Sequence, residues 1–252
     1  MSSVSSVFQN LRFSKQKETR NLKLETWTEA KPNRAKLNLK PKLKMNNSSK
    51  SQFNYPDIIN WLQNKGIELY GNHFKILETD YQIVYKLIAY FLKDEQACYQ
   101  FNIDLEKGIL LTGPIGCGKT SLMNLMKHIA PIGNKFSVKP CRNISFEFIQ
   151  DGYQIIHKYS IGQLYHTDPR TYCFDDLGTE NNLKYFGNEC NVMAEILLSR
   201  YDLFISKKIK THITTNLSAS EIEKHYGNRV RSRLRELCNL IAFDNNIDDK
   251  RK

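Results

Sequence analysis

A glycine-rich segment near the middle of the chain, GPIGCGKT at residues 113–120, restricts the possible folds more than any other feature. The apolar run GILLT precedes it and the helical pattern SLMNLMKHIA follows it, so the segment is predicted to join a buried strand to a helix. Glycines let the backbone wrap closely around a phosphate, and the helix N-terminus adds positive potential. The spacing GxxxxGKT in this context therefore predicts a nucleoside triphosphate site.

Each residue type in this loop has an expected contribution. Lys119 is expected to reach the β- and γ-phosphates, and Thr120 is expected to offer its hydroxyl to Mg²⁺. The residues predicted to bind the nucleotide are Gly113, Pro114, Ile115, Gly116, Cys117, Gly118, Lys119, Thr120 and Ser121. A dinucleotide site of the GxGxxG type is excluded, since Ile115 stands at the second glycine position.

Polar residues follow two further apolar runs that are typical of strands. Asp175 and Asp176 follow YCF directly, and Asn216 follows THITT. Ligands bind at the carboxyl ends of parallel strands, where the phosphate loop is also expected. Asp175 is predicted to hold Mg²⁺, Asp176 to orient or deprotonate the attacking water, and Asn216 to reach the γ-phosphate if its strand neighbours the phosphate-loop strand. Two alternatives stay open: the acids can mark a strand-ending turn, and Asn216 can cap the next helix.

The segment GNRVRSRLREL at 227–237 places Arg229 and Arg233 four residues apart on one helical face. An arginine presented to the γ-phosphate of a neighbouring subunit stabilises transition-state charge and links hydrolysis to assembly. A solvated basic face is the alternative interpretation. Arg200 is interpreted as an ion-pair or packing residue.

From residue 108 onward, short apolar runs alternate with longer helical patterns. Strands are predicted at 108–113, 136–138, 171–174, 211–215 and 240–243, and helices at 81–97, 121–130, 145–159, 191–206 and from Ser220. We expect the helix at 191–206 to be the longest. This alternation predicts an α/β fold, in which helices flank a parallel sheet on both faces. The expected organisation is a flexible basic arm at 1–52, a helical region at 53–107 and a P-loop domain at 108–252.

The net charge of +11 is concentrated at the N-terminus, because residues 1–50 hold twelve Lys and Arg against three Glu. A basic, aromatic-poor arm suits contact with a phosphate backbone, and a solvated disordered tail is the alternative. No apolar stretch is long enough for a membrane span, so we expect a cytoplasmic protein without a membrane partner. The six cysteines show no CxxC spacing, so neither a zinc site nor a disulfide framework is indicated.

Five motifs in order, GILLTGPIGCGKTSLM, YCFDDLG, THITTN, GNRVRSRL and DDKRK, resemble the AAA+ ATPases of the DnaC helicase-loader and IstB transposition-helper group, especially the short forms on bacterial mobile elements. The resemblance covers about 108–243. It implies a Walker A motif at 113–120, the Walker B magnesium acid at Asp175, sensor 1 at Asn216 and the arginine finger at Arg233, preceded by Arg229. Asp176 stands where many members have a glutamate.

The resemblance also implies a function. It indicates an ATPase that uses ATP and Mg²⁺, acts with single-stranded DNA and with a replicative helicase or a transposase, and forms a homo-oligomer through Arg233. Nine residues follow Phe243, so a C-terminal lid domain with its sensor 2 arginine is not expected. The basic arm and aromatic residues such as Tyr153 and Tyr159 are candidates for holding single-stranded DNA by charge and stacking.

Two other functions remain compatible with a phosphate loop. A nucleoside or nucleotide kinase uses the same loop to move a phosphoryl group to a small acceptor, and Arg200 with Tyr201 would then be candidate substrate-binding residues. A nucleotide-gated binding module with little hydrolysis is the other, because the shorter carboxylate of Asp176 positions water less well than a glutamate.

Overall fold

The computed structural model describes residues 53–161, 169–180, 183–185, 188–244, 247, 249 and 250. The predicted basic arm at 1–52 lies outside the described residues, and the three-part domain organisation stays a prediction. All described residues belong to one compact unit that begins at Ser48. Within the described residues, no helix combines the length and the apolar character that crossing a bilayer requires.

The helices cover most of the described chain. Their bounds are α1 Tyr55–Tyr70, α2 Tyr81–Leu92, α3 Glu95–Gln100, α4 Lys119–Ile129, α5 Cys141–Asp151, α6 Gln154–Ser160, α7 Val192–Lys207 and α8 Ala219–Leu237, with short 3-10 turns η1 Glu78–Asp80 and η2 Ile132–Asn134.

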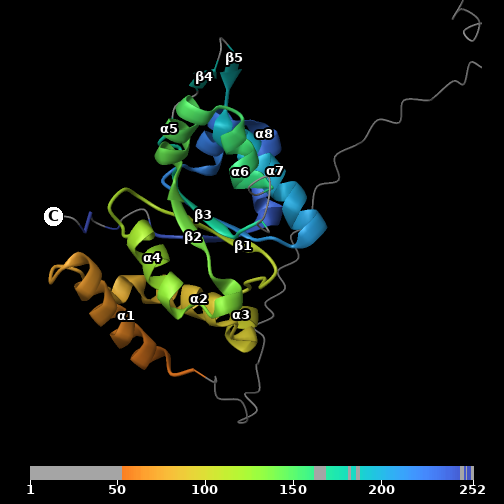
Figure 1. Ribbon diagram of the computed structural model, residues 1–252. Helices are drawn as coiled ribbons and strands as arrows, with labels where there is room; N and C mark the ends of the chain where they lie inside the picture. The colour runs from red at the N-terminus through yellow and green to blue at the C-terminus, as the bar shows by residue number, and fades with distance from the viewer. Residues whose placement is uncertain are drawn as a thin grey trace, which may run out of the picture. The chain divides into compact units, whose positions relative to one another are not determined.

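Five strands form one parallel sheet in the order β2-β3-β6-β1-β7. They are β1 Gly108–Thr112, β2 Ser137–Pro140, β3 Tyr172–Leu177, β6 Thr211–Thr215 and β7 Cys238–Ala242. A separate antiparallel hairpin joins β4 Leu183–Tyr185 to β5 Asn188–Cys190 (Figure 1). The predicted fold class, an α/β fold with a parallel sheet flanked by helices, is confirmed.

Alternate residues of β1, an interior strand, contribute to the two faces of the sheet. Ile109 and Leu111 join a buried cluster with α2 and α4, while Leu110 joins a second cluster with α5 and α7. Figure 1 shows α1 to α4 on one side of the sheet and α5 to α8 on the other. A strand buried on both faces is apolar at successive positions, which explains the run ILL.

Three predicted helices differ from those observed. The one expected at 81–97 is two helices, because Lys93 adopts a left-handed conformation and the Asp94 side chain caps α3 by accepting the Ala97 N–H at 3.0 Å. The one expected at 145–159 is also two, separated at Gly152 with φ +61°. Helix α7 is not the longest, since α8 has 19 residues against 16, with a bend at Gly227.

His212 lies inside β6 and is buried in the sheet. Its Nδ1 accepts the Ile109 N–H at 3.1 Å, and the rings of Tyr90, Phe91 and Phe136 surround it. Burial, reinforced by the charges of neighbouring cationic residues, lowers the pKa of the imidazole to about 3. The folded protein therefore holds this histidine in its neutral form.

The buried neutral histidine predicts a specific pH dependence of stability. As pH falls, His212 gains a proton in the unfolded chain near pH 6.5 but not in the folded state until about 3, so the unfolded state is favoured. We expect the free energy of unfolding to fall by about 2 kcal/mol between about pH 7.5 and about pH 5 from this group. In His212→Asn, which keeps an acceptor for the Ile109 N–H, urea unfolding should show a correspondingly smaller loss. An equal loss in both proteins would contradict the assignment.

Candidate functional site

The carboxyl ends of three parallel strands meet at one edge of the sheet. Strand β6 lies between β1 and β3, with Thr215 in register with Thr112 on one side and Leu177 on the other. The phosphate loop follows β1, and Asn216 follows β6. The prediction that Asn216 contacts the γ-phosphate required β6 to lie next to β1. The two strands are paired neighbours in the sheet.

The ammonium group of Lys119 bonds to the loop, and the residue as a whole is only 5% exposed. It donates hydrogen bonds to the carbonyl oxygens of Gly113 at 2.9 Å and Pro114 at 2.8 Å, and to Oδ1 of Asn216. The Cys117 thiol is buried 3.6 Å from the same nitrogen. The lysine thus connects the loop to the end of β6.

The carboxylate of Asp175, on β3, accepts hydrogen bonds from two other elements, α4 and β6. Thr120 Oγ1, at the start of α4, donates to its two oxygens at 2.9 and 3.0 Å, and Thr214 Oγ1, from β6, donates at 2.7 Å. Asp175 is 4% exposed, and burial raises the pKa of its carboxyl group. The Thr214 hydrogen bond opposes this shift, the charge of Asp176 adds to it, and Thr120 and Lys119 oppose it.

Asp176 has an unusual backbone. Its φ is +54°, in the left-handed region, at an irregularity of β3 where the register with β6 shifts. The Asp176 N–H donates to Thr214 Oγ1 at 2.9 Å, so Thr214 holds both acids at once. The two acids differ in surroundings, since Asp176 lines the cavity described below while Asp175 is buried and does not line it. Strand β3 continues to Leu177, so the acids do not form the strand-ending turn of the alternative interpretation.

Asn216 does not cap the helix that follows it. The cap of α8 is Ser218, whose Oγ accepts the Glu221 N–H while Glu221 Oε2 accepts the Ser218 N–H at 2.8 Å. The amide of Asn216 is therefore available to Lys119.

A cavity of about 400 Å³ opens above the loop. One wall is the predicted one: Ile115, Gly116, Gly118, Lys119, Thr120, Ser121, Asp176 and Asn216. The other wall was not predicted from the sequence: Tyr70, His73, Phe74, Lys75, Leu77 and Lys250. Most of this second wall is the linker at 71–77 between α1 and η1. Its sequence signals were only Gly71 and the absence of helical periodicity.

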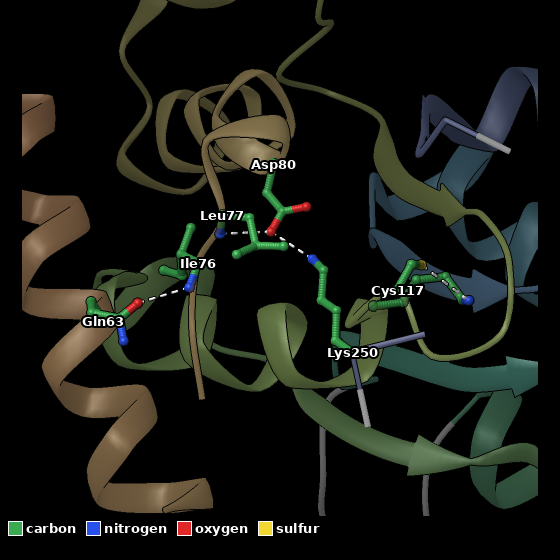
Figure 2. Close-up of polar contacts among 7 residues, drawn as sticks. Gln63, Ile76, Leu77, Asp80, Cys117 and Lys250 are labelled. Carbon is green, nitrogen blue, oxygen red and sulfur yellow. Dashed lines mark hydrogen bonds and ion pairs between the residues drawn. The ribbon is translucent and has the colours of Figure 1, made fainter. Parts of the chain in front are cut away.

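Gln63 of α1 holds this linker in place (Figure 2). Its Oε1 accepts the Ile76 N–H at 2.7 Å, as Figure 2 shows. Its Nε2 donates to the Phe74 carbonyl oxygen at 2.8 Å. The side-chain amide thus provides both an acceptor and a donor to backbone groups of the linker, as a paired β-strand would. A fixed linker gives the cavity a defined second wall.

The arginines lie away from the cavity. Neither Arg229 nor Arg233 lines it; Arg229 is exposed, and the Arg233 guanidinium lies 4.9 Å from the ring centre of Tyr201. Arg200 is fully buried and donates to Thr211 Oγ1 and to the carbonyl oxygens of residues 170 and 210. Arg200 is therefore a packing residue at the opposite edge of the sheet, not a substrate-binding residue at the cavity.

The residues at the cavity fit a magnesium-bound nucleotide. The hydroxyl of Thr120 and the carboxylate of Asp175 are hard oxygen donors of the kind that Mg²⁺ prefers, and Mg²⁺ commonly uses one or two protein ligands together with phosphate oxygens. Gly116 and Gly118 have φ of +81° and +98°, which other residues rarely adopt. Within the described ranges, no cluster of three His, Cys, Asp or Glu side chains is arranged to hold a different metal.

Asp175→Asn is expected to stabilise the protein in the absence of nucleotide. Because the pKa of Asp175 is raised, ionisation is less favourable in the folded state, and the stability that this group removes grows as pH rises above its unfolded pKa. Asn keeps an acceptor for the two threonine hydroxyls. We expect a gain on the order of 1 kcal/mol at neutral pH by chemical denaturation. Asp176→Asn is the control, with a smaller expected gain because its side chain is partly exposed; equal gains would contradict this account.

Comparison with solved structures gives weak likenesses over the described fold. A crystal structure of the DnaC helicase loader matches 69% of this chain and 95% of its own, with 17% identity and a TM-score of 0.48. DnaI matches 68% and 85%, with 17% identity and a TM-score of 0.46. AMPPCP-bound DnaA from Aquifex aeolicus matches 70% and 50%, with 15% identity and a TM-score of 0.44.

No protein-family model matches the sequence, and no curated protein matches it. The structural neighbours thus include the helicase-loader group that the sequence motifs resemble. At these identities and TM-scores, the likeness assigns no function to the chain.

Proposed function

We propose that this protein binds Mg-ATP at the cavity above the phosphate loop and hydrolyses it. The observation that carries the proposal is that hydrogen bonds bring three separate segments together: Lys119 bonds Asn216, and the neighbouring residues Thr120 and Thr214 both bond Asp175. A cation, a buried carboxylate with a neighbouring hydroxyl and a polar amide around one cavity are the groups that phosphoryl transfer to water requires. A chance glycine-rich turn would not be accompanied by this set.

Each residue has a role in the proposal. Lys119 binds phosphate oxygens, and Thr120 with Asp175 would hold Mg²⁺. The ion supplies neutralisation of the charge that develops on the phosphates. Asp176, which faces the cavity, orients the attacking water and accepts its proton. Asn216 exchanges its bond with Lys119 for contact with the terminal phosphate or the water.

The second wall suits the base of the nucleotide. Phe74 and Leu77 give it apolar surface, Ile115 of the phosphate loop adds apolar surface on the first wall, and Leu77 and Ile115 are 43% and 65% exposed. Burial of a purine ring against exposed apolar side chains is favourable. Of the two alternative functions, the kinase loses its candidate substrate arginine, since Arg200 is buried elsewhere. The nucleotide-gated binding module would use the same site and differs from the proposed function only in hydrolysing little ATP.

Thr214→Val tests the site with little change in volume. The substitution removes one hydrogen bond to Asp175 and the partner of the Asp176 N–H. We expect the apparent affinity for Mg²⁺ in ATP binding to fall by about tenfold or more, as is typical of lost second-shell bonds. Isothermal titration with ATP across a magnesium series measures it. Turnover is expected to fall as well.

Two matched variants complete this test. Thr215→Val removes the neighbouring hydroxyl, which bonds Leu177 and Leu217 and neither acid, so magnesium dependence should be unchanged. Lys119→Ala should abolish detectable ATP binding. If Lys119→Ala binds Mg-ATP as the unmodified protein does, the proposal is wrong.

We further propose that single-stranded DNA binds along α5. Arg142, Phe146 and Ile149 lie on one face of this helix at positions i, i+4 and i+7, followed by Tyr153, and all four are exposed. Positive charge with exposed aromatic rings suits backbone contact and base stacking. The suggestion of Tyr159 was wrong, because its side chain is fully buried and its hydroxyl bonds Glu147 at 2.9 Å.

Phe146→Ala with Tyr153→Ala is expected to weaken binding of a labelled oligo-dT about tenfold or more, because each stacked base contributes substantially. Fluorescence anisotropy at fixed salt measures it. The control is Ile132→Ala, which removes an apolar side chain that is 91% exposed on η2. Unchanged affinity in the double variant would place DNA binding elsewhere on the chain.

A role as a replication helicase loader or mobile-element accessory protein, with a helicase or transposase as partner, completes the proposal. It rests on the sequence motifs together with the ATP site. Assembly as a homo-oligomer through Arg233 stays a prediction. The contact with the Tyr201 ring fixes the position of the Arg233 guanidinium on α8, and this is the structural support for that prediction.

A further inference from the structure

The described C-terminal residues lie against the phosphate loop. The Lys250 N–H donates to the Gly116 carbonyl oxygen at 3.2 Å. A Cβ at Gly116 would lie 2.0 Å from Asp249 Oδ1, and one at Gly118 would lie 3.9 Å from Lys250 Nζ. The tail therefore approaches the loop so closely that a side chain at position 116 would displace it.

The Lys250 side chain, which lines the cavity, reaches Asp80 at the end of η1 (Figure 2). Its Nζ lies 2.5 Å from Asp80 Oδ2, which also accepts the Leu77 N–H at 3.0 Å. Asp80 is 2% exposed, and its Oδ1 has no hydrogen-bond partner among the residues that the structure describes. A buried carboxylate without full hydrogen bonding depends strongly on its cation.

This ion pair joins two segments that are 170 residues apart. Asp80 is the last residue of η1, which directly follows the linker at 71–77 in the cavity wall. Lys250 contacts the phosphate loop through its backbone N–H. Lys250 lines the cavity together with Gly118 and Lys119, and its Nζ lies 3.9 Å from where a Cβ at Gly118 would be. A triphosphate on the loop would bring several negative charges within reach of the cation that now neutralises Asp80.

We propose that Lys250 is a phosphate-binding residue supplied by the C-terminal tail, and that Asp80 competes with the nucleotide for it. This inference rests on the proposed Mg-ATP site. Transfer of the ammonium from Asp80 to a phosphate leaves the buried Asp80 carboxylate without its counter-charge. The free energy that this requires lowers the affinity for the nucleotide. The same transfer frees the linker from the tail, which couples nucleotide binding to the position of the second wall.

A double-mutant cycle measured by titration of Mg-ATP tests the inference. Asp80→Asn keeps an acceptor for the Leu77 N–H and removes the competing charge, so ATP should bind about fivefold tighter. Lys250→Met keeps the apolar stem and removes the phosphate contact, so ATP should bind about tenfold more weakly. In the double variant the gain from Asp80→Asn should vanish, because no cation remains to be released.

Two controls separate this effect from general damage. Lys250→Arg should bind Mg-ATP within about twofold of the unmodified protein, since the cation is kept. Lys224→Met, which removes an exposed lysine of α8, should change nothing. Thermal unfolding of every variant without nucleotide identifies loss of folding, and the double variant, which removes both charges, avoids an unpaired buried carboxylate.

The outcomes are distinct. If ATP binds but Asp80→Asn tightens it equally with and without Lys250, or if both single variants change only the melting temperature, the inference is overturned while the proposed function stands. If the unmodified protein does not bind Mg-ATP, the proposed function fails and the inference fails with it.

Discussion

The site depends on the hydrogen bonds that the end of β6 makes to both of its neighbours. Thr214 bonds the carboxylate of Asp175 and the backbone of Asp176 on one side, and Asn216 bonds Lys119 on the other. Because Asp175, Thr214 and Lys119 are buried, loss of a partner leaves a charge or a donor unsatisfied, at a cost greater than the bond itself contributes. Beyond the backbone hydrogen bonds of the sheet, side-chain hydrogen bonds from the end of β6 thus hold the phosphate loop and the two acids together.

This arrangement costs stability. Asp175 is buried with a raised pKa, Lys119 is 5% exposed, and Asp176 has a left-handed backbone that is unfavourable for a residue with a side chain. The apolar clusters on the two faces of the sheet supply the compensating burial. Such concentration of unfavourable groups at one edge is expected of a site selected for binding and chemistry rather than for stability.

The cavity is completed by segments that come from before β1 and after β7. Gln63 fixes the linker at 71–77, and Asp80 with Lys250 ties the end of that segment to the tail. A nucleotide in this cavity would contact both segments as well as the phosphate loop. Under the proposed function, nucleotide binding therefore affects the region between α1 and α2 as well as the phosphate loop.

The sequence by itself determined the local chemistry: the loop at 113–120, the apolar runs that become strands, and the positions of Asp175 in the carboxyl-terminal half of β3 and of Asn216 directly after β6. These follow from adjacent residues, because turn geometry and strand burial are encoded over a few positions. Only the tertiary structure decided the strand order, the role of Thr214, the burial of Tyr159 and the pairing of Asp80 with Lys250. Those depend on which distant segments pack together, and packing of distant segments leaves no periodic pattern in the chain.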